Sequence, residues 1–295
     1  MLKDAYGRVV TSLRISVTRK CNLNCIYCHR EGEDESGEEI SAERIAEIAR
    51  AFYELGVRKL KITGGEPLLR KDICEIISSM PSFEEISMTT NGTILSKKAM
   101  DLKESGLDRV NVSLDTLDEE KFRYITGKME LKAVLEGIES AVEAKLTPLK
   151  LNMVLMKGLN EDEVFRMLEF ANSFNKNETA VILQLIELIP NSKTSQLYLN
   201  PEIFEREFGR MSRVIKIRDM HRRKQFLTSM GVVEIVKPLD NSEFCRHCNR
   251  VRITSDGKIK LCLMRNETID ISGLHGKELK RAIVEAVKLR KPFFT

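Results

Sequence analysis

The sequence predicts an α/β fold in which a parallel sheet is covered by outer helices. Short aliphatic and β-branched runs alternate with amphipathic stretches over the first two-thirds of the chain, which is typical of βα units in series. Several of these runs are continuously apolar, as strands covered on both faces are. The 295 residues, 42% of them hydrophobic and 31% charged, can supply a sizeable core.

Six strands are predicted from the apolar runs, at residues 13–18, 59–63, 85–90, 109–115, 149–156 and 181–189. Helices are predicted between them, at residues 41–55, 72–80, 97–105, 129–144 and 161–174. In the first helix Ile45, Ile48 and Phe52 recur at spacings of three and four residues, and Ser41 stands at the N-cap position. Functional residues of such a sheet are expected at the C-terminal ends of the strands.

The βα pattern weakens after about residue 200. The charged segment 201–230 is predicted to be helical, and its basic run from Arg218 to Lys224 is interpreted as a solvated helix face, with an anion contact as the alternative. Strand-like residues 232–236 and 251–254 follow. We therefore expect a core domain over residues 4–227 and a C-terminal segment over residues 228–295.

Composition excludes several classes of protein. No apolar run approaches the roughly 20 residues of a membrane span, and the N-terminal residues lack a signal peptide, so a cytoplasmic location without membrane attachment is expected. Trp is absent and aromatic residues make up 6%, which disfavours a nucleic-acid stacking surface. A formal net charge of +4 is compatible with a nucleotide ligand, and no nucleic-acid partner is expected.

Six of the seven cysteines form two triplets. Cys21, Cys25 and Cys28 have the spacing C-x3-C-x2-C, and the second triplet, Cys245–Cys248–Cys262, has C-x2-C-x13-C. A closed zinc or iron–sulfur site has four protein ligands, so each triplet leaves one metal coordination position free. The alternatives are a zinc knuckle completed by His29 for the first triplet and a zinc-ribbon fragment for the second, and Cys74 is interpreted as a buried structural thiol.

The first triplet, with Tyr27 before its last cysteine, resembles the signature of the radical S-adenosylmethionine (SAM) superfamily. Gly64-Gly65-Glu66-Pro67 after the second strand resembles that family's GGEP motif, and Ser113 ends the fourth strand, where the family binds SAM. The resemblance implies a [4Fe-4S] cluster on the three catalytic cysteines. It also implies SAM contacts from Tyr27, Gly65, Glu66 and Ser113, and a partial (β/α)6 TIM-type barrel with a C-terminal cluster-binding extension.

The second triplet, followed by Asn249-Arg250-Val251-Arg252, resembles the MoaA family of GTP 3′,8-cyclases from molybdenum cofactor biosynthesis. Segments from LRISVTRKCNLNCIYC to FCRHCNRVRITSDGKIKLCL are similar to that family in the same order. The resemblance implies a second [4Fe-4S] cluster on Cys245, Cys248 and Cys262, whose open iron binds the guanine of GTP. It further implies that basic side chains surround the triphosphate.

By that resemblance the GTP-binding residues are Arg14, Lys61, Thr89, Lys150, Arg250 and Arg252. Arg250 and Arg252 alternate along a strand and should project on the same face. The implied reaction converts GTP to (8S)-3′,8-cyclo-7,8-dihydroguanosine 5′-triphosphate, through a 5′-deoxyadenosyl radical made from SAM. An electron donor and a downstream cyclic pyranopterin monophosphate synthase are the implied partners, and a homodimer is compatible with the sequence.

Two departures from the family pattern stand out. Gln184 stands where bacterial members usually have arginine, which puts one substrate contact in doubt, and Ile189 stands where they have methionine. The final residues, KPFFT, lack the Gly-Gly tail of bacterial members and resemble archaeal ones. The alternative functions are a peptide-modifying radical SAM maturase with an auxiliary cluster and, in a different class, a zinc or nucleic-acid-binding module.

Overall fold

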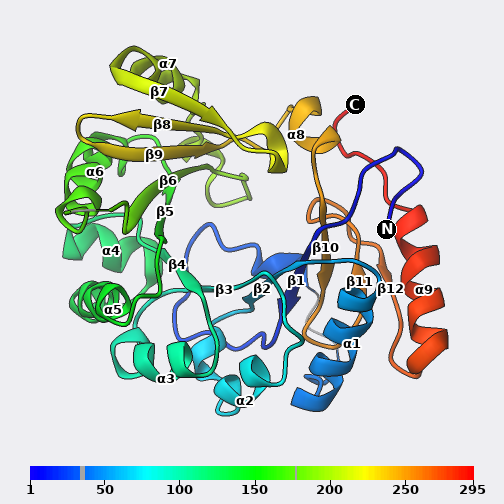
Figure 1. Cartoon of the computed structure of the whole chain (residues 1–295). Coiled ribbons are helices and arrows are strands. Elements are labelled where there is room, and N and C mark those ends of the chain that lie inside the picture. Colours follow the sequence, from blue (N-terminus) through cyan, green and yellow to red (C-terminus); the bar gives the residue numbers. More distant parts are fainter. Residues whose placement is uncertain (34–36, 177) are drawn as a thin grey trace.

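The computed structural model describes residues 1–33, 37–176 and 178–295. Within these ranges the strands form one sheet, which curves around a central space and carries helices on its outer side (Figure 1). The strands are β1 (Ser12–Ser16), β2 (Lys59–Thr63), β3 (Glu85–Thr90), β4 (Arg109–Ser113), β5 (Leu149–Leu155), β6 (Val181–Glu187), β7 (Ser212–Ile217), β8 (Lys224–Thr228), β9 (Gly231–Val236), β10 (Arg250–Ile253), β11 (Ile259–Lys260) and β12 (Thr268–Ile269).

The strand order confirms the partial barrel and extends it on both sides. Strands β1 to β6 are parallel and lie in sequence order; β10 pairs parallel with β1, and β9 pairs parallel with β6. Antiparallel strands continue each edge, with β11 and β12 beyond β10 and with β8 and β7 beyond β9. Because β12 and β7 are the two ends of this order in the described ranges, the barrel stays open.

Most of the helices cover the outside of the sheet (Figure 1). The helices are α1 (Ala42–Glu54), α2 (Ile73–Ser78), α3 (Ala99–Glu104), α4 (Glu119–Thr126), α5 (Leu131–Glu143), α6 (Val164–Ser173), α7 (Glu202–Met211), α8 (Ser242–Arg246) and α9 (Gly276–Lys288). Helix α8 instead lies near the start of β10 (Figure 1). The Ser41 hydroxyl caps α1, as predicted, by accepting from the backbone N–H of Arg44 at 3.3 Å. Helix α4 was not predicted, although Asp118 caps its start and Gly127, at φ +78°, ends it.

The predicted strand ranges agree with the structure at β2 and β3, and the other four end one to two residues earlier than predicted. Strand β1 stops at Ser16 because the chain turns there into the first cysteine loop. The N–H of Val17 still donates to the carbonyl of Thr63 at 2.9 Å, so the hydrogen bonding between β1 and β2 continues one residue beyond β1. Cys74 was expected to be buried; it lies on α2 and packs against the core, but it is only partly buried.

The helical prediction for residues 201–230 is wrong beyond α7. Strand β7 starts at Ser212 and pairs with β8, because β-branched Val214, Ile215 and Ile217 favour an extended chain. Strand β8 then forms a tight hairpin with β9. This hairpin spans the expected boundary at residues 227 and 228, so the sheet is continuous there, and the division into two domains stays a prediction.

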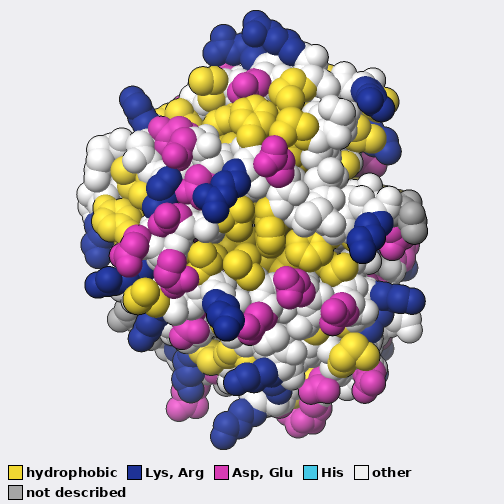
Figure 2. Space-filling view, turned by 90° about the vertical axis from the view of Figure 1, so that its left-hand side faces the viewer, with side chains coloured by type: hydrophobic (Ala, Val, Ile, Leu, Met, Phe, Trp, Pro, Cys, Tyr) yellow, Lys and Arg dark blue, Asp and Glu magenta, His cyan; other side chains and the backbone are white. Residues whose placement is uncertain are grey.

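The core lies between the sheet and its helices, whose outer faces meet solvent. Figure 2 shows one such face, where side chains of both charge signs are interspersed with hydrophobic ones. Across the described parts of the chain, none of the helices is long and apolar enough to cross a membrane.

Replacing a core residue of β2 tests this packing. Ile62 is 1% exposed, whereas Ile215 on the edge strand β7 is 47% exposed. We expect Ile62→Ala to lower the free energy of unfolding by about 2–5 kcal/mol, because it leaves a cavity under the sheet. Ile215→Ala is the matched control and should cost less than about 1 kcal/mol. Denaturant titrations of both variants measure the difference, and equal losses would contradict this arrangement of the core.

Candidate active site

A cavity of about 840 Å³ fills the inside of the barrel. Alternate residues of the parallel strands line it, because successive side chains of a strand point to opposite faces. These residues are Ser12 and Arg14 of β1, Lys59 and Lys61 of β2, Glu85, Ser87 and Thr89 of β3, Arg109 and Asn111 of β4, Lys150 and Asn152 of β5, and Gln184 and Ile186 of β6. This part of the barrel interior is therefore polar, and the cations that these strands contribute lie within the strands rather than at their C-terminal ends.

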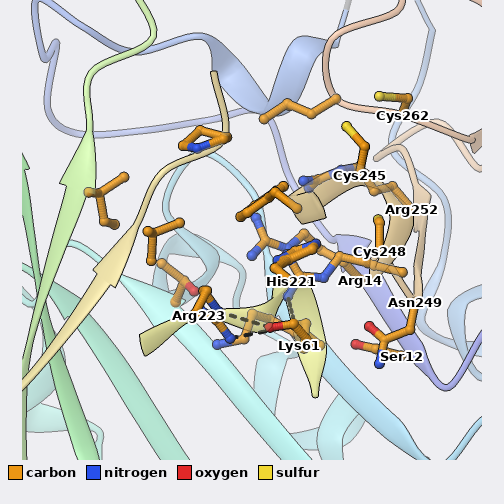
Figure 3. A pocket seen from close by; sticks show the side chains of 18 of the residues that line it. Ser12, Arg14, Lys61, His221, Arg223, Cys245, Cys248, Asn249, Arg252 and Cys262 are labelled. Atoms are coloured by element: carbon orange, nitrogen blue, oxygen red, sulfur yellow. Dashed lines mark hydrogen bonds between the residues drawn. The ribbon is translucent and has the colours of Figure 1, made fainter. Parts of the chain in front are cut away.

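The strand register brings three of the predicted GTP contacts together. Arg14 of β1 lies directly beside Arg252 of β10 on one side and Lys61 of β2 on the other. Arg250 projects into the same cavity as Arg252, as the alternation predicted. Figure 3 shows Arg14, Lys61 and Arg252 gathered around this pocket.

Glu31 partly neutralises this group. Its carboxylate accepts from Arg14 Nη1 at 2.8 Å and from Arg252 Nη1 at 2.7 Å. Burial opposes ionisation of Glu31, yet the two guanidinium groups hold the pKa of its carboxyl well below the usual range. Glu31 stands three residues after Cys28, so this ion pair also ties the first cysteine loop to β1 and β10.

Two further cations of the cavity face like charges. Burial, and after it the neighbouring cation Arg109, lowers the pKa of the Lys61 ammonium well below its usual value. Burial, and after it Arg14 and Arg252, does the same to the pKa of Arg250. The Nε atoms of Arg14 and Arg250 are buried without a hydrogen-bond partner in the described structure. The chemistry of this wall suits a multiply charged anion.

Lys150 lies in a second charged group on the opposite part of the sheet. Its ammonium donates to Glu234 of β9 at 2.7 Å, and Gln184 Nε2 donates to the other oxygen of that carboxylate at 2.8 Å. Arg223 Nη1 lies 2.7 Å from the same oxygen as Gln184, and Arg218 lies 3.4 Å from the one that Lys150 uses. The interpretation of 218–224 as a solvated helix face is therefore wrong: a buried carboxylate draws Arg218 and Arg223 inward.

The second cysteine triplet lines the same cavity, at the end formed by α8 and β10 (Figure 3). All three thiols are free, and backbone and side-chain groups donate to two of the sulfurs: Arg290 Nη2 to Cys248 at 3.4 Å and Phe294 N–H to Cys245 at 3.5 Å. Burial opposes ionisation of Cys248, but the Arg290 guanidinium lowers the pKa of its thiol. Such donors stabilise thiolates, so this triplet fits a cluster-binding role.

The first triplet lies in the loop after β1. Backbone N–H groups of Leu23 and Arg30 donate to the sulfurs of Cys21 and Cys28 at 3.5 and 3.4 Å. Burial first, then Asp115 and the other two thiols, raise the pKa of Cys25, because thiolates held close together repel one another. A bound metal would relieve this repulsion, so the donor set fits a cluster. Among the described side chains, no three of His, Cys, Asp and Glu meet as ligands of a single metal ion would.

The GGEP loop packs tightly on this cysteine loop. A Cβ on Gly64 would stand 2.5 Å from the Thr18 carbonyl oxygen, and one on Gly65 would stand 2.6 Å from that of Arg19. The close approach lets Gly65 N–H donate to the Thr18 carbonyl at 2.7 Å and Glu66 N–H to that of Lys20 at 2.7 Å. Both glycines are therefore needed to join the ends of β1 and β2, a role that the sequence did not reveal.

Glu66 is fully buried and holds the neighbouring loop. Its carboxylate accepts from Thr90 Oγ1 at 2.7 Å, from Asn91 N–H at 2.6 Å and from Leu68 N–H at 3.0 Å. Burial outweighs these donors and raises the pKa of Glu66 to about 7. The residue therefore ties together the loops after β2 and β3, and a contact with SAM stays a prediction.

The remaining predicted residues lie at or near strand ends. Tyr27 donates through its hydroxyl to Asp115, directly after β4, at 2.6 Å, and it lines the cavity. Ser113 is the last residue of β4 and lies beside Asn152 of β5 in the register. Thr89 lies beside Asn111 and also lines the cavity.

Several residues in and behind the cavity wall were not predicted. Glu31 and Arg223 line the cavity and Glu234 lies behind it, and none of them gave a spacing signal. A lone glutamate inside the apolar run 232–236 could still have indicated a buried ion pair. His221, at φ +62°, stacks on Phe244 with ring centroids 3.7 Å apart and lines the cavity beside the second triplet. Burial first, and then nearby arginines, lower the pKa of this imidazole, so it is neutral at neutral pH.

Comparison with known proteins identifies the class. Residues 15–171 match the Radical SAM superfamily and residues 181–295 match the family described as Molybdenum Cofactor Synthesis C. The solved structure of Streptococcus suis SuiB bound to S-adenosylmethionine has a TM-score of 0.66 at 16% identity, covering 94% of this chain and 68% of that one. Native anSMEcpe with bound AdoMet has a TM-score of 0.60 at 16% identity, covering 94% and 84%. The chain belongs to the radical SAM superfamily and is an enzyme.

The particular family follows from the relatives. A "Probable GTP 3′,8-cyclase" of Archaeoglobus fulgidus is 61% identical over 294 residues, covering 100% of this chain and 99% of the relative. A protein of the same name from Pyrococcus abyssi is 44% identical, with 100% of both chains covered. The chain therefore belongs to the GTP 3′,8-cyclase family, as the sequence motifs predicted.

The buried carboxyl of Glu66 predicts a pH dependence of stability. Because its pKa rises from 4.5 to about 7 on folding, the unfolded chain releases this proton at lower pH than the folded chain does. The contribution of Glu66 to stability therefore falls as the pH rises through the window from about 4.5 to about 7.

We expect the wild type to lose stability relative to Glu66→Gln across that window, and the two curves to run parallel above it. Denaturant midpoints of both proteins, measured at several pH values, check this. Curves that run parallel throughout would contradict the pKa shift of Glu66.

Proposed function

We propose that this enzyme cyclises GTP to (8S)-3′,8-cyclo-7,8-dihydroguanosine 5′-triphosphate in molybdenum cofactor biosynthesis. One observation carries the proposal: a single cavity is lined by the second cysteine triplet, is reached by the first cysteine loop through Tyr27 and His29, and is strongly cationic between them. Among the described residues that line it, twelve are Lys or Arg and four are Asp or Glu. A nucleoside triphosphate, with several negative charges, is a ligand that this excess would attract.

The proposed position of GTP follows from the positive charge of the cavity wall and from the position of the second cysteine triplet. Arg14, Lys61, Arg250 and Arg252 would hold the triphosphate from β1, β2 and β10, since all four face one region of the cavity. Lys150 and Thr89 would contact the nucleotide from β5 and β3. Cys245, Cys248 and Cys262 would hold a second [4Fe-4S] cluster, whose open iron would bind the guanine.

The first triplet would hold the cluster that binds SAM. With one electron from a reductant, the cluster and SAM would supply radical chemistry, releasing methionine and removing a hydrogen atom from the ribose of GTP. The chain itself orients the reactants. Tyr27 donates a hydrogen bond to Asp115, and the Glu66 carboxylate accepts hydrogen bonds from Thr90 and Asn91, so both side chains are held in place. Direct contacts from Tyr27, Gly65, Glu66 and Ser113 to SAM belong to this proposal.

This function requires two partners, and the same site bears on the alternative functions. An electron donor would feed the first cluster, and a cyclic pyranopterin monophosphate synthase would receive the product. Neither a peptide-modifying maturase nor a zinc module is favoured by the family match, and neither would need a cavity with this excess of arginine and lysine.

Anaerobic reconstitution with iron and sulfide tests the whole proposal. We expect about eight irons per chain, about four for each triplet, together with reductive SAM cleavage. A product with the mass of the cyclised nucleotide should form only when GTP is supplied. Replacing Cys245, Cys248 and Cys262 together by alanine should lower the iron content to about four and retain SAM cleavage. Bound zinc without SAM cleavage would overturn the proposal.

Changes at β10 test the substrate site separately. Arg250→Ala and Arg252→Ala should each weaken GTP turnover about tenfold to a hundredfold, because each removes a charge-assisted hydrogen bond to the triphosphate. SAM cleavage should persist, since neither residue lies in the first cysteine loop and Arg14 still holds Glu31 of that loop when Arg252 is replaced. Arg246→Ala, an exposed arginine on α8, is the control and should change neither. Equal loss of SAM cleavage and GTP turnover in the Arg250 and Arg252 variants would count against the assigned roles.

A further inference from the structure

Gln184 faces a buried carboxylate in the next strand. The parallel pairing of β6 with β9 places Gln184 directly beside Glu234, and the amide donates to Glu234 Oε1 at 2.8 Å. Glu234 is fully buried and does not line the cavity, whereas Gln184 does. The amide of Gln184 thus connects the cavity wall to an anion that lies behind it.

Arg223 shares that carboxylate oxygen with Gln184. Its Nη1 lies 2.7 Å from Glu234 Oε1, and its side chain is 11% exposed. Arg223 stands just before β8, after the turn Met220–Arg222, and its Nε donates to the Met220 carbonyl at 3.4 Å. The side chain lines the cavity, as Figure 3 shows. The Arg223 guanidinium and the Gln184 amide therefore contact the same oxygen of Glu234, although the two residues come from different parts of the chain.

Charge and donor count leave Arg223 able to bind a second anion. Glu234 carries one negative charge and faces the cations Lys150, Arg223 and Arg218. A guanidinium has five N–H donors in a planar fork. In Arg223, Nη1 contacts Glu234, Nε donates to the Met220 carbonyl and Nη2 lies 3.6 Å from the Met220 sulfur, so each terminal nitrogen keeps one further N–H for the cavity. Glu234 fixes Arg223 and Lys150 from behind, so both cations are already oriented before any ligand arrives.

We infer that Arg223, held in place by Glu234, binds a phosphate group of the nucleotide and supplies at this wall the guanidinium that Gln184 does not. The inference rests on the proposed function, since it deepens the description of that substrate site. Arg223 and Lys150 then form a second cationic wall, facing the group made by Arg14, Arg250 and Arg252. Glu234 is a positioning residue, because its carboxylate contacts the cations and not the cavity.

Equilibrium binding to the anaerobically reconstituted chain tests the inference, with GTP, guanosine and inorganic triphosphate as separate probes. Arg223→Ala should weaken GTP and triphosphate binding about tenfold to a hundredfold and change guanosine binding less than about twofold. Arg222→Ala is the matched control: it removes the same charge from the preceding, exposed residue, which does not line the cavity, and should change none of the three.

Two further variants keep the test decisive if Arg223→Ala is unstable. Arg223→Lys retains a cation beside Glu234 and loses the planar fork, so it should fold and weaken GTP binding several-fold. Adding Gln184→Arg to Arg223→Ala returns a guanidinium to the same carboxylate from β6 and should recover most of the lost GTP affinity. This rescue is a result that a merely structural ion pair would not produce.

Two sets of results would contradict these proposals, and they can be told apart. Unchanged GTP binding in both Arg223 variants, or equal weakening of GTP and guanosine, would overturn the inference while leaving GTP cyclisation by the wild type intact. A wild type that cleaves SAM but neither binds nor converts GTP would instead overturn the proposed function, and the inference with it.

Discussion

Like-charge repulsion inside one cavity limits how this barrel can be built. Arginine and lysine side chains from several strands line the cavity, and burial together with neighbouring cations lowers the pKa of Lys61 and Arg250. Two carboxylates reduce this repulsion. Glu31 bridges Arg14 and Arg252, and Glu234 holds Lys150 and Arg223. Each carboxylate faces at least two cations, so each group keeps a net positive charge. A bound polyphosphate would neutralise that charge.

The sheet sets the geometry of these walls. Parallel pairing places Arg252, Arg14 and Lys61 side by side on adjacent strands, and the two-residue period turns all of them inward. The same rule places Gln184 beside Glu234 at the other edge. Strands β9 and β10 come from the last third of the chain, so residues far apart in sequence complete one barrel around one cavity (Figure 1).

The cysteine loops, by contrast, are held by their neighbours rather than by regular secondary structure. Asn24 and Ile26 donate to carbonyls at the end of α4, and the GGEP loop bonds to the carbonyls of Thr18 and Lys20. Arg290, after the last helix, reaches Cys248, so the end of the chain supports the second triplet. Rigid supports of this kind are what a site needs in order to orient a reactive cofactor and its substrate.

The βα order, the cysteine triplets and the family could be predicted from the sequence, because apolar periodicity and motif spacing are local properties. The resemblance also indicated Arg14, Lys61, Lys150, Arg250 and Arg252, all of which line the cavity. The partners of these side chains follow from the tertiary structure. Glu31 and Arg223 stand in irregular segments, and Glu234 stands in a strand whose neighbour is 50 residues away, at Gln184. Ion pairs between such segments depend on strand order and register, which local sequence does not encode.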